Sequence, residues 1–134
     1  MNIRRLSALL LAATLCGSAP LFAASESEIP ASFSIQTVTV ASGGGLKFER
    51  GDLRSDVMFA MKNKLCQRLS HNVWAYDGFF AENAHSDLLR RCETLVVTFE
   101  NDRVVDVQLV NKPAFAAIAA NVKLDQSQRK FASR

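Results

Sequence analysis

The feature that most constrains the fold is a pair of apolar segments, Thr94 to Glu100 and Arg103 to Val110. Together they are rich in valine, a β-branched residue that favours strands. Only Asn101 and Asp102 separate the two segments, and both residue types tolerate the left-handed backbone of a tight turn. The sequence therefore predicts a β-hairpin over residues 94–110.

Two further strands are predicted upstream of this hairpin. Residues 33–40 alternate, with Phe33 and Ile35 on one side and Val38 and Val40 on the other, which indicates a strand. The glycine run that follows predicts a flexible turn, because it lacks the Gly-Lys-Ser/Thr ending of a phosphate loop.

The next predicted strand is aromatic. Residues 73–80 include Trp74, Tyr76, Phe79 and Phe80. A period of two places Trp74, Tyr76 and Phe80 on one side of such a strand and Phe79 on the other. We expect Trp74 to lie in the core and Phe79 to be exposed.

Two helices are predicted, one before the aromatic strand and one after the hairpin. The second is a short alanine-rich helix with Pro113 in its first turn, ending near residue 122. The first begins after Gly51, with Asp52 as its N-cap. Its apolar positions recur at helical spacing: Leu53, Val57, Ala60, Met61 and Leu65.

These elements predict an α+β fold. We expect a short helix packed on a three-stranded antiparallel meander, with a four-stranded meander as the alternative, followed by a short C-terminal helix. One domain is expected over residues 33–122, between a flexible N-terminal stretch at 24–32 and a polar tail at 123–134.

Residues 1–23 have the organisation of a secretory signal peptide. Two arginines precede an apolar run, and small residues at its exit predict cleavage after Ala23 or Ala24. The apolar run is too short to cross a bilayer. Lipid attachment at Cys16 is disfavoured because the bulky Leu15 stands immediately before it. We therefore expect an exported protein of the periplasm.

The mature chain is close to electrically neutral. The full sequence has 16 basic and 13 acidic side chains, and removal of Arg4 and Arg5 leaves 14 basic ones, a net charge of about +1. Proteins that bind nucleic acid through its phosphates need a larger positive charge. We expect no nucleic-acid partner.

Two cysteines remain after export, Cys66 and Cys92. An oxidising compartment favours a disulfide between them, which would stabilise the fold by roughly 3–4 kcal/mol. A zinc site is a weaker interpretation because His71 and His85 stand at spacings that fit no zinc pattern. A nucleophilic cysteine lacks a partner signature.

Several of these residues follow the order found in a known family. They are Gly51, Val57, Ala60, Met61 and Leu65, then Trp74-Ala75-Tyr76, the strand at 95–99 and Asn111-Lys112-Pro113-Ala114. In this order and spacing, residues 48–115 resemble the SmpA/OmlA (BamE-like) family of small outer-membrane assembly lipoproteins. The resemblance implies a helix-and-meander fold, a protein partner in the cell envelope and, as an alternative to a free periplasmic protein, association with the outer membrane.

The sequence offers little for catalysis, so we expect a protein that is not an enzyme and needs no cofactor or metal. It has no Ser-His-Asp pattern and no recognisable pair of catalytic carboxylates. Asp77, Glu82 and His85 fall close together, but a solvated loop explains them better than an acid–base set.

Binding of a protein partner is the expected function. An exposed aromatic beside a sheet is a natural docking point, and Phe79 is the best single candidate. Arg90, Arg91 and Arg103 are its expected polar neighbours. Two classes of partner stay open: an envelope assembly component, or a secreted enzyme that the protein binds or inhibits as a soluble periplasmic domain.

Overall fold

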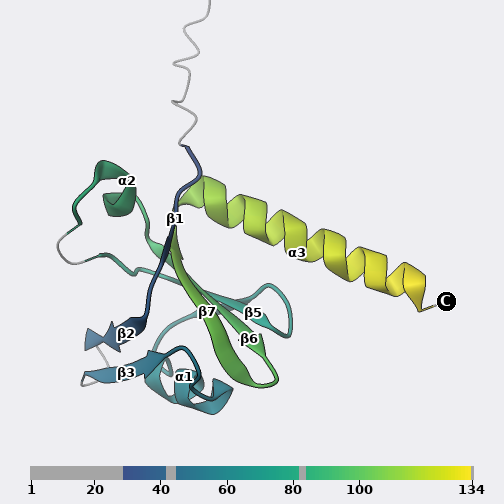
Figure 1. The fold of residues 1–134 in the computed structure, drawn as a ribbon, viewed down its shortest axis with the longest axis horizontal. Coiled ribbons are helices and arrows are strands. Elements are labelled where there is room, and N and C mark those ends of the chain that lie inside the picture. The colour runs from purple at the N-terminus through teal and green to yellow at the C-terminus, as the bar shows by residue number, and fades with distance from the viewer. Residues whose placement is uncertain (1–28, 42–44, 82–83, 134) are drawn as a thin grey trace, which may run out of the picture.

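The computed structural model describes residues 29–41, 45–81 and 84–133, which form seven strands and three helices (Figure 1). Five strands make an antiparallel sheet in the order β1-β7-β6-β5-β4, and two make a small sheet, β2-β3. The α+β class and the antiparallel sheet are as predicted. The elements are β1 (Ser32–Ser34), β2 (Thr37–Val40), β3 (Leu46–Glu49), α1 (Arg54–Ala60), β4 (Cys66–Arg68), β5 (Val73–Asp77), α2 (Asp87–Arg90), β6 (Thr94–Glu100), β7 (Arg103–Val110) and α3 (Lys112–Ala132).

Some of the predictions concern residues that the structure does not describe. The signal peptide at residues 1–23 with Cys16, the start of the stretch at 24–32, most of the glycine turn and Glu82 lie outside the described residues.

The predicted hairpin is confirmed at both of its strands and at its turn. Asn101 and Asp102 have positive φ angles of 50° and 60°. The register shifts after the pair Thr98–Asp106, since Phe99 pairs with Val104, and this leaves one extra residue on β7. Such a bulge turns the strand. It explains how Val104 and Val107, three positions apart, lie in the same core.

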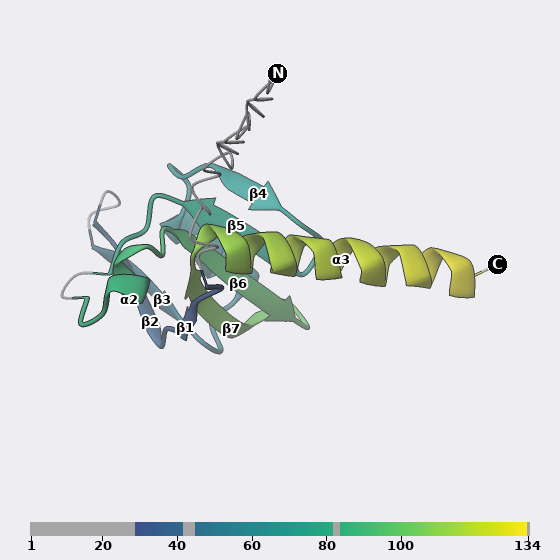
Figure 2. The same ribbon diagram turned by 90° about the horizontal axis from the view of Figure 1, so that it is seen from above.

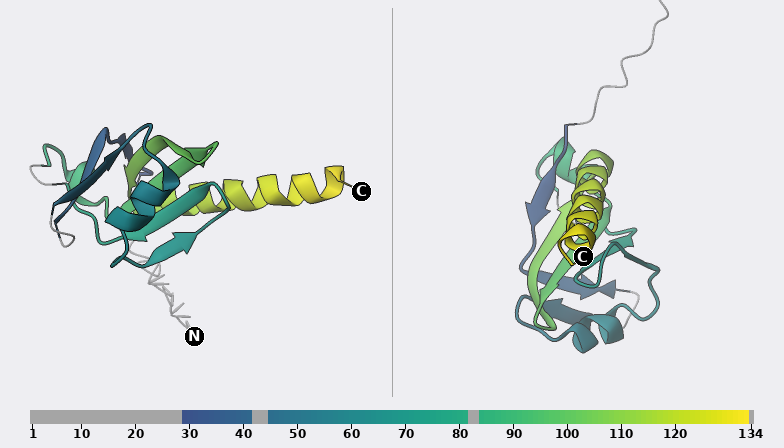
Figure 3. Two further views of the ribbon diagram at one scale, coloured as in Figure 1. Left: turned by 90° about the horizontal axis from the view of Figure 1, so that it is seen from below. Right: turned by 90° about the vertical axis from the view of Figure 1, so that its right-hand side faces the viewer.

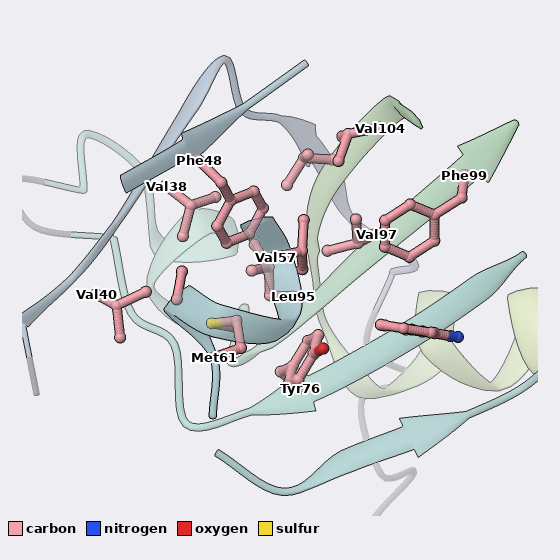
Figure 4. Packing of buried hydrophobic residues seen from close by; sticks show 13 residues of the cluster. Val38, Val40, Phe48, Val57, Met61, Tyr76, Leu95, Val97, Phe99 and Val104 are labelled. Carbon is pink, nitrogen blue, oxygen red and sulfur yellow. The ribbon is translucent and has the colours of Figure 1, made fainter. Parts of the chain in front are cut away.

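The main core lies between one face of the large sheet and a layer made by α1 and the small sheet. Trp74 and Tyr76 of β5 belong to it, as their alternation predicted. Figure 4 shows side chains of α1 and the small sheet directed toward those of β5, β6 and β7. The remaining members are Val38, Val40, Phe48, Val57, Ala60, Met61, Leu95, Val97, Phe99, Val104 and Val107.

The opposite face of the sheet is covered by the first turns of α3. Ala114, Phe115 and Ile118 pack there against Ala75 and Val96. The helix then extends well beyond the sheet (Figure 2). The prediction of a short helix with a polar tail is wrong, because α3 continues to Ala132. Its second half contains no glycine or proline, so nothing in the sequence stops the helix.

The strand predicted at 33–40 is two strands in different sheets. Its first part, β1, pairs with β7, and the Ile35 N–H donates to the Val107 carbonyl at 2.9 Å. The chain then leaves the large sheet, and β2 pairs with β3. The small sheet lies beside α1 (Figure 3). The large sheet is thus wider than the predicted meander, since β1 and β4 extend it at its two edges.

The segment before α1 is fixed by the hairpin rather than by an Asp52 cap. Leu53 is the N-cap residue, and its N–H donates to the Asp56 carboxylate at 3.0 Å. The Arg54 N–H donates to the Asp102 carbonyl at 2.8 Å. The Gly51 N–H donates to the Val104 carbonyl at 2.7 Å. The helix is also shorter than its apolar pattern, and Leu65 lies beyond it, exposed.

The predicted disulfide is wrong, because no disulfide joins Cys66 to Cys92. Cys66 is exposed on β4, opposite Tyr76 of β5, and burial together with the nearby thiol raises the pKa of the Tyr76 hydroxyl. Cys92 is fully buried before β6, with its thiol 3.3 Å from the Leu88 carbonyl oxygen. Strand β5 lies between the two segments. Strands are about 4.8 Å apart, so a gap of roughly 10 Å exceeds the reach of a disulfide.

We expect iodoacetamide to modify Cys66 in the native protein and Cys92 only after denaturation, because the first thiol is exposed and the second is buried. Mass spectrometry of proteolytic peptides, made without reduction, measures both. A peptide pair linked through Cys66 and Cys92 would contradict the structure.

Asn111 ties the N-terminal end of β1 to the start of α3. Its side chain is fully buried, and its Oδ1 accepts from the N–H groups of Ala31 at 2.9 Å and Ala114 at 3.1 Å. Its Nδ2 donates to the Ile29 carbonyl at 2.8 Å. One side chain therefore caps the helix and anchors an edge strand.

Replacing Asn111 by alanine should lower the free energy of unfolding by about 2–4 kcal/mol. The change removes a helix cap and leaves the buried Ala31 N–H without its acceptor. Urea denaturation followed by circular dichroism measures this. Asn121→Ala, at an exposed position of the same helix, is the control and should change stability by less than about 0.5 kcal/mol. Equal effects of the two substitutions would show that Asn111 has no such role.

Candidate binding groove along the edge of the small sheet

The structure brings three of the four predicted contact residues to one end of the large sheet. The N–H groups of Gly78 and Phe79 both donate to the Glu93 carbonyl, at 2.9 and 3.0 Å. This places Phe79 beside the segment that follows α2. Arg90 is the last residue of α2 and Arg91 follows it directly, and both are exposed. The Arg90 guanidinium is 3.5 Å from the Asp87 carboxylate.

Arg103 lies elsewhere. It begins β7 at the far end of β6 from Glu93, and the length of that strand separates the two ends by roughly 20 Å. Its guanidinium donates to the Gly51 carbonyl at 2.8 Å. Arg103 thus holds the segment before α1, and it does not share a surface with Phe79.

Phe79 and Phe80 have exchanged the positions that alternation predicted. Phe79 is half-buried and packs against the main core, whereas Phe80 is 69% exposed. The cause is Gly78, which follows the end of β5 with a φ of +82°. This left-handed residue ends the strand and its period of two, and glycine adopts the conformation without a steric penalty. The exposed aromatic at this end is therefore Phe80.

An apolar groove lies between β2 and the segment that contains these two phenylalanines. It comprises a cavity of about 360 Å³ and an adjoining one of about 330 Å³, and we call it the edge groove. Thr39, Ala41, Phe79 and Phe80 line both cavities. The other lining residues are Ile35, Thr37, Val38, Val40, Lys64, Gly78, Ala81, Leu95 and Leu109.

The groove follows the edge of β2 rather than one of its faces. Neighbouring residues of a strand point to opposite faces, yet the consecutive residues Thr37, Val38 and Thr39 all line the groove. No residue of β3 lines it. Along this edge, no backbone hydrogen bond joins β2 to another described residue. The groove therefore adjoins unpaired backbone groups.

The chemistry of the groove suits binding more than catalysis. Ile35, Leu95 and Leu109 make it apolar, and the only charged lining residue is Lys64, whose Nζ lies 5.3 Å from the centre of the Phe79 ring. Asp77, one of the three residues considered above as an acid–base set, accepts a hydrogen bond from the Thr94 hydroxyl at 2.8 Å. Across the described residues, no group of three or more His, Cys, Asp or Glu side chains has a metal-binding arrangement.

The sequence pointed to one wall of the groove, the segment that contains Phe79, but did not indicate the groove itself. Phe79 was identified from its aromatic strand, whereas the opposite wall comes from β2, about forty positions earlier in the chain. The one feature of the sequence that could have indicated this wall is the uncharged Thr-Val-Thr-Val pattern of β2. The pattern is common in strands, so it does not by itself identify a binding edge.

No protein-family model matches the chain, and no significant match was found among curated proteins or solved structures. The resemblance to the SmpA/OmlA family therefore stays a prediction. None of the helices in the described part of the chain is long and apolar enough to cross a membrane.

The burial of the two phenylalanines predicts opposite effects of their removal. Phe79→Ala should lower the free energy of unfolding by about 1–2 kcal/mol, because its partly buried side chain packs against the core. Phe80→Ala should leave it within about 0.5 kcal/mol. Thermal denaturation of both variants measures this, and a larger loss for Phe80→Ala would overturn the assignment of the exposed residue.

Proposed function

We propose that the protein is a non-enzymatic binding module of the bacterial cell envelope, and that it holds an extended segment of a protein partner in the edge groove. The observation that carries the proposal is the unpaired edge of β2 beside an apolar floor. A peptide strand can add to such an edge, where main-chain hydrogen bonds provide affinity and pockets for alternate side chains provide specificity.

The groove defines what kind of segment fits. An added strand would place every second side chain toward the floor formed by Ile35, Leu95 and Leu109, so those positions of the partner should be apolar. Phe80 is exposed at the rim and can cover the bound segment. Lys64 favours an acidic residue at that end of the groove.

The envelope location is supported by the sequence. The signal peptide predicted at residues 1–23 favours export, and the resemblance of residues 48–115 to the SmpA/OmlA family favours a partner in outer-membrane assembly. A soluble secreted enzyme is the alternative partner.

Crosslinking in intact cells tests this proposal. A photoreactive amino acid at position 80 should capture one protein partner, whereas the same group at position 131 should not, although Phe131 is 75% exposed on α3. Mass spectrometry identifies the captured protein. An envelope protein supports the proposal, and a secreted enzyme in a one-to-one complex supports the inhibitor alternative.

A charge placed on the strand edge provides a second test. Thr39→Lys should weaken partner capture at least tenfold, because lysine on an edge strand opposes the addition of another strand. Ser127→Lys, on an exposed part of α3, is the control and should leave capture unchanged. Capture that survives Thr39→Lys would show that the partner binds elsewhere.

A further inference from the structure

A separate cavity of about 470 Å³ lies between α1 and the turn that joins β4 to β5. It shares no lining residue with the edge groove, and we call it the Trp74 pocket. Its lining residues are Arg54, Met58, Arg68, Ser70, His71 and Trp74.

Arg54 is the fixed part of this pocket. Its side chain is only 13% exposed, and its Nε lies 2.8 Å from the Asp102 carboxylate. Its remaining nitrogens donate to the His71 carbonyl and, at 3.1 Å, to the Asn72 amide oxygen. The guanidinium also lies 5.1 Å from the centre of the Trp74 ring. The charge of Arg54 is therefore already balanced within the protein.

Arg68 supplies the positive charge that is not balanced. It is exposed on the edge strand β4, with its guanidinium 4.8 Å from the centre of the Trp74 ring. It forms no ion pair with any described residue. Stacking on the ring holds the guanidinium at the pocket while leaving its N–H groups available.

Trp74 is the second residue of the pocket with an unpartnered polar group. The residue is 4% exposed, and its Nε1 is the one buried side-chain nitrogen or oxygen without a hydrogen-bond partner among the described residues. Buried indole N–H groups usually find an acceptor, and a buried N–H without one destabilises the folded protein. An acceptor on a ligand in the pocket that reached this N–H would satisfy it.

We propose that the Trp74 pocket binds a carboxylate that is attached to an apolar group. Arg68 would balance the carboxylate charge, and the Trp74 N–H would donate to one of its oxygens. Met58, half-exposed on α1, offers an apolar wall for the rest of the ligand. One uncompensated charge matches a monoanion better than a phosphate group, which carries up to two negative charges near neutral pH. An aliphatic acid and the C-terminal residue of a peptide share this chemistry.

The single tryptophan of the chain reports directly on the pocket. We would titrate the full mature protein with octanoate, N-acetyl-phenylalanine and N-acetyl-phenylalaninamide, following tryptophan fluorescence and the indole N–H signal in NMR. At least one of the two acids should give a saturable change and move the indole signal downfield, and the amide should not. The acid that binds identifies the source, aliphatic or peptide-like.

Two variants test the role of the arginine. Arg68→Gln should weaken acid binding at least tenfold, whereas Arg90→Gln, which removes an exposed arginine of α2, should leave it unchanged. Circular dichroism confirms that both variants fold. No saturable change with either acid, equal binding of acid and amide, or full affinity in Arg68→Gln would each overturn the proposal. None of these results bears on the edge groove.

Discussion

The burial of β6 on both faces is the constraint on which the rest of the structure depends. Six of its seven residues are buried or half-buried, so each face of the sheet needs a cover. Leu95, Val97 and Phe99 are covered by α1 and the small sheet, while Val96 lies under α3. Asn111 positions α3, the cover of the second face. Its side chain caps the start of α3 directly after β7, and it also accepts from the N–H of Ala31, just before β1. The three-layer arrangement therefore follows from the need to shield both faces of β6 from solvent.

The sequence predicted those elements whose local pattern agrees with their tertiary role. The strands at 94–110 and their turn have the predicted bounds because valine content, alternation and Asn101-Asp102 all favour the same hairpin. Other elements depend on distant partners. The three residues of β4 form a strand only by pairing with β5, and no alternation marks them. Residues 33–40 look like one strand because nothing in their pattern shows that the chain changes sheets near Gln36.

The candidate sites were predictable only in part, for a related reason. Aromatic content pointed to the segment of Phe79, but which phenylalanine is exposed depends on the positive φ of Gly78. The amino-acid composition of the segment does not determine that angle. The Trp74 pocket combines Arg54, Arg68 and Trp74 from three elements. In the sequence, each of the three is an ordinary surface or core residue. Only the fold shows that Arg54 is paired with Asp102, whereas Arg68 has no ion-pair partner in the described part of the chain.

The four sheet edges are not protected equally, and the difference supports our proposal that a partner strand adds to β2. Natural proteins protect edge strands with charge, short length or a cover. Strand β4 is short and carries Arg68, β3 carries Lys47 and Glu49, and both serines of the short β1 have side-chain partners. The four residues of β2 include no charge, and an apolar groove adjoins their free edge. An uncharged edge of this kind can pair with another chain, and this supports the proposal that a partner segment binds there.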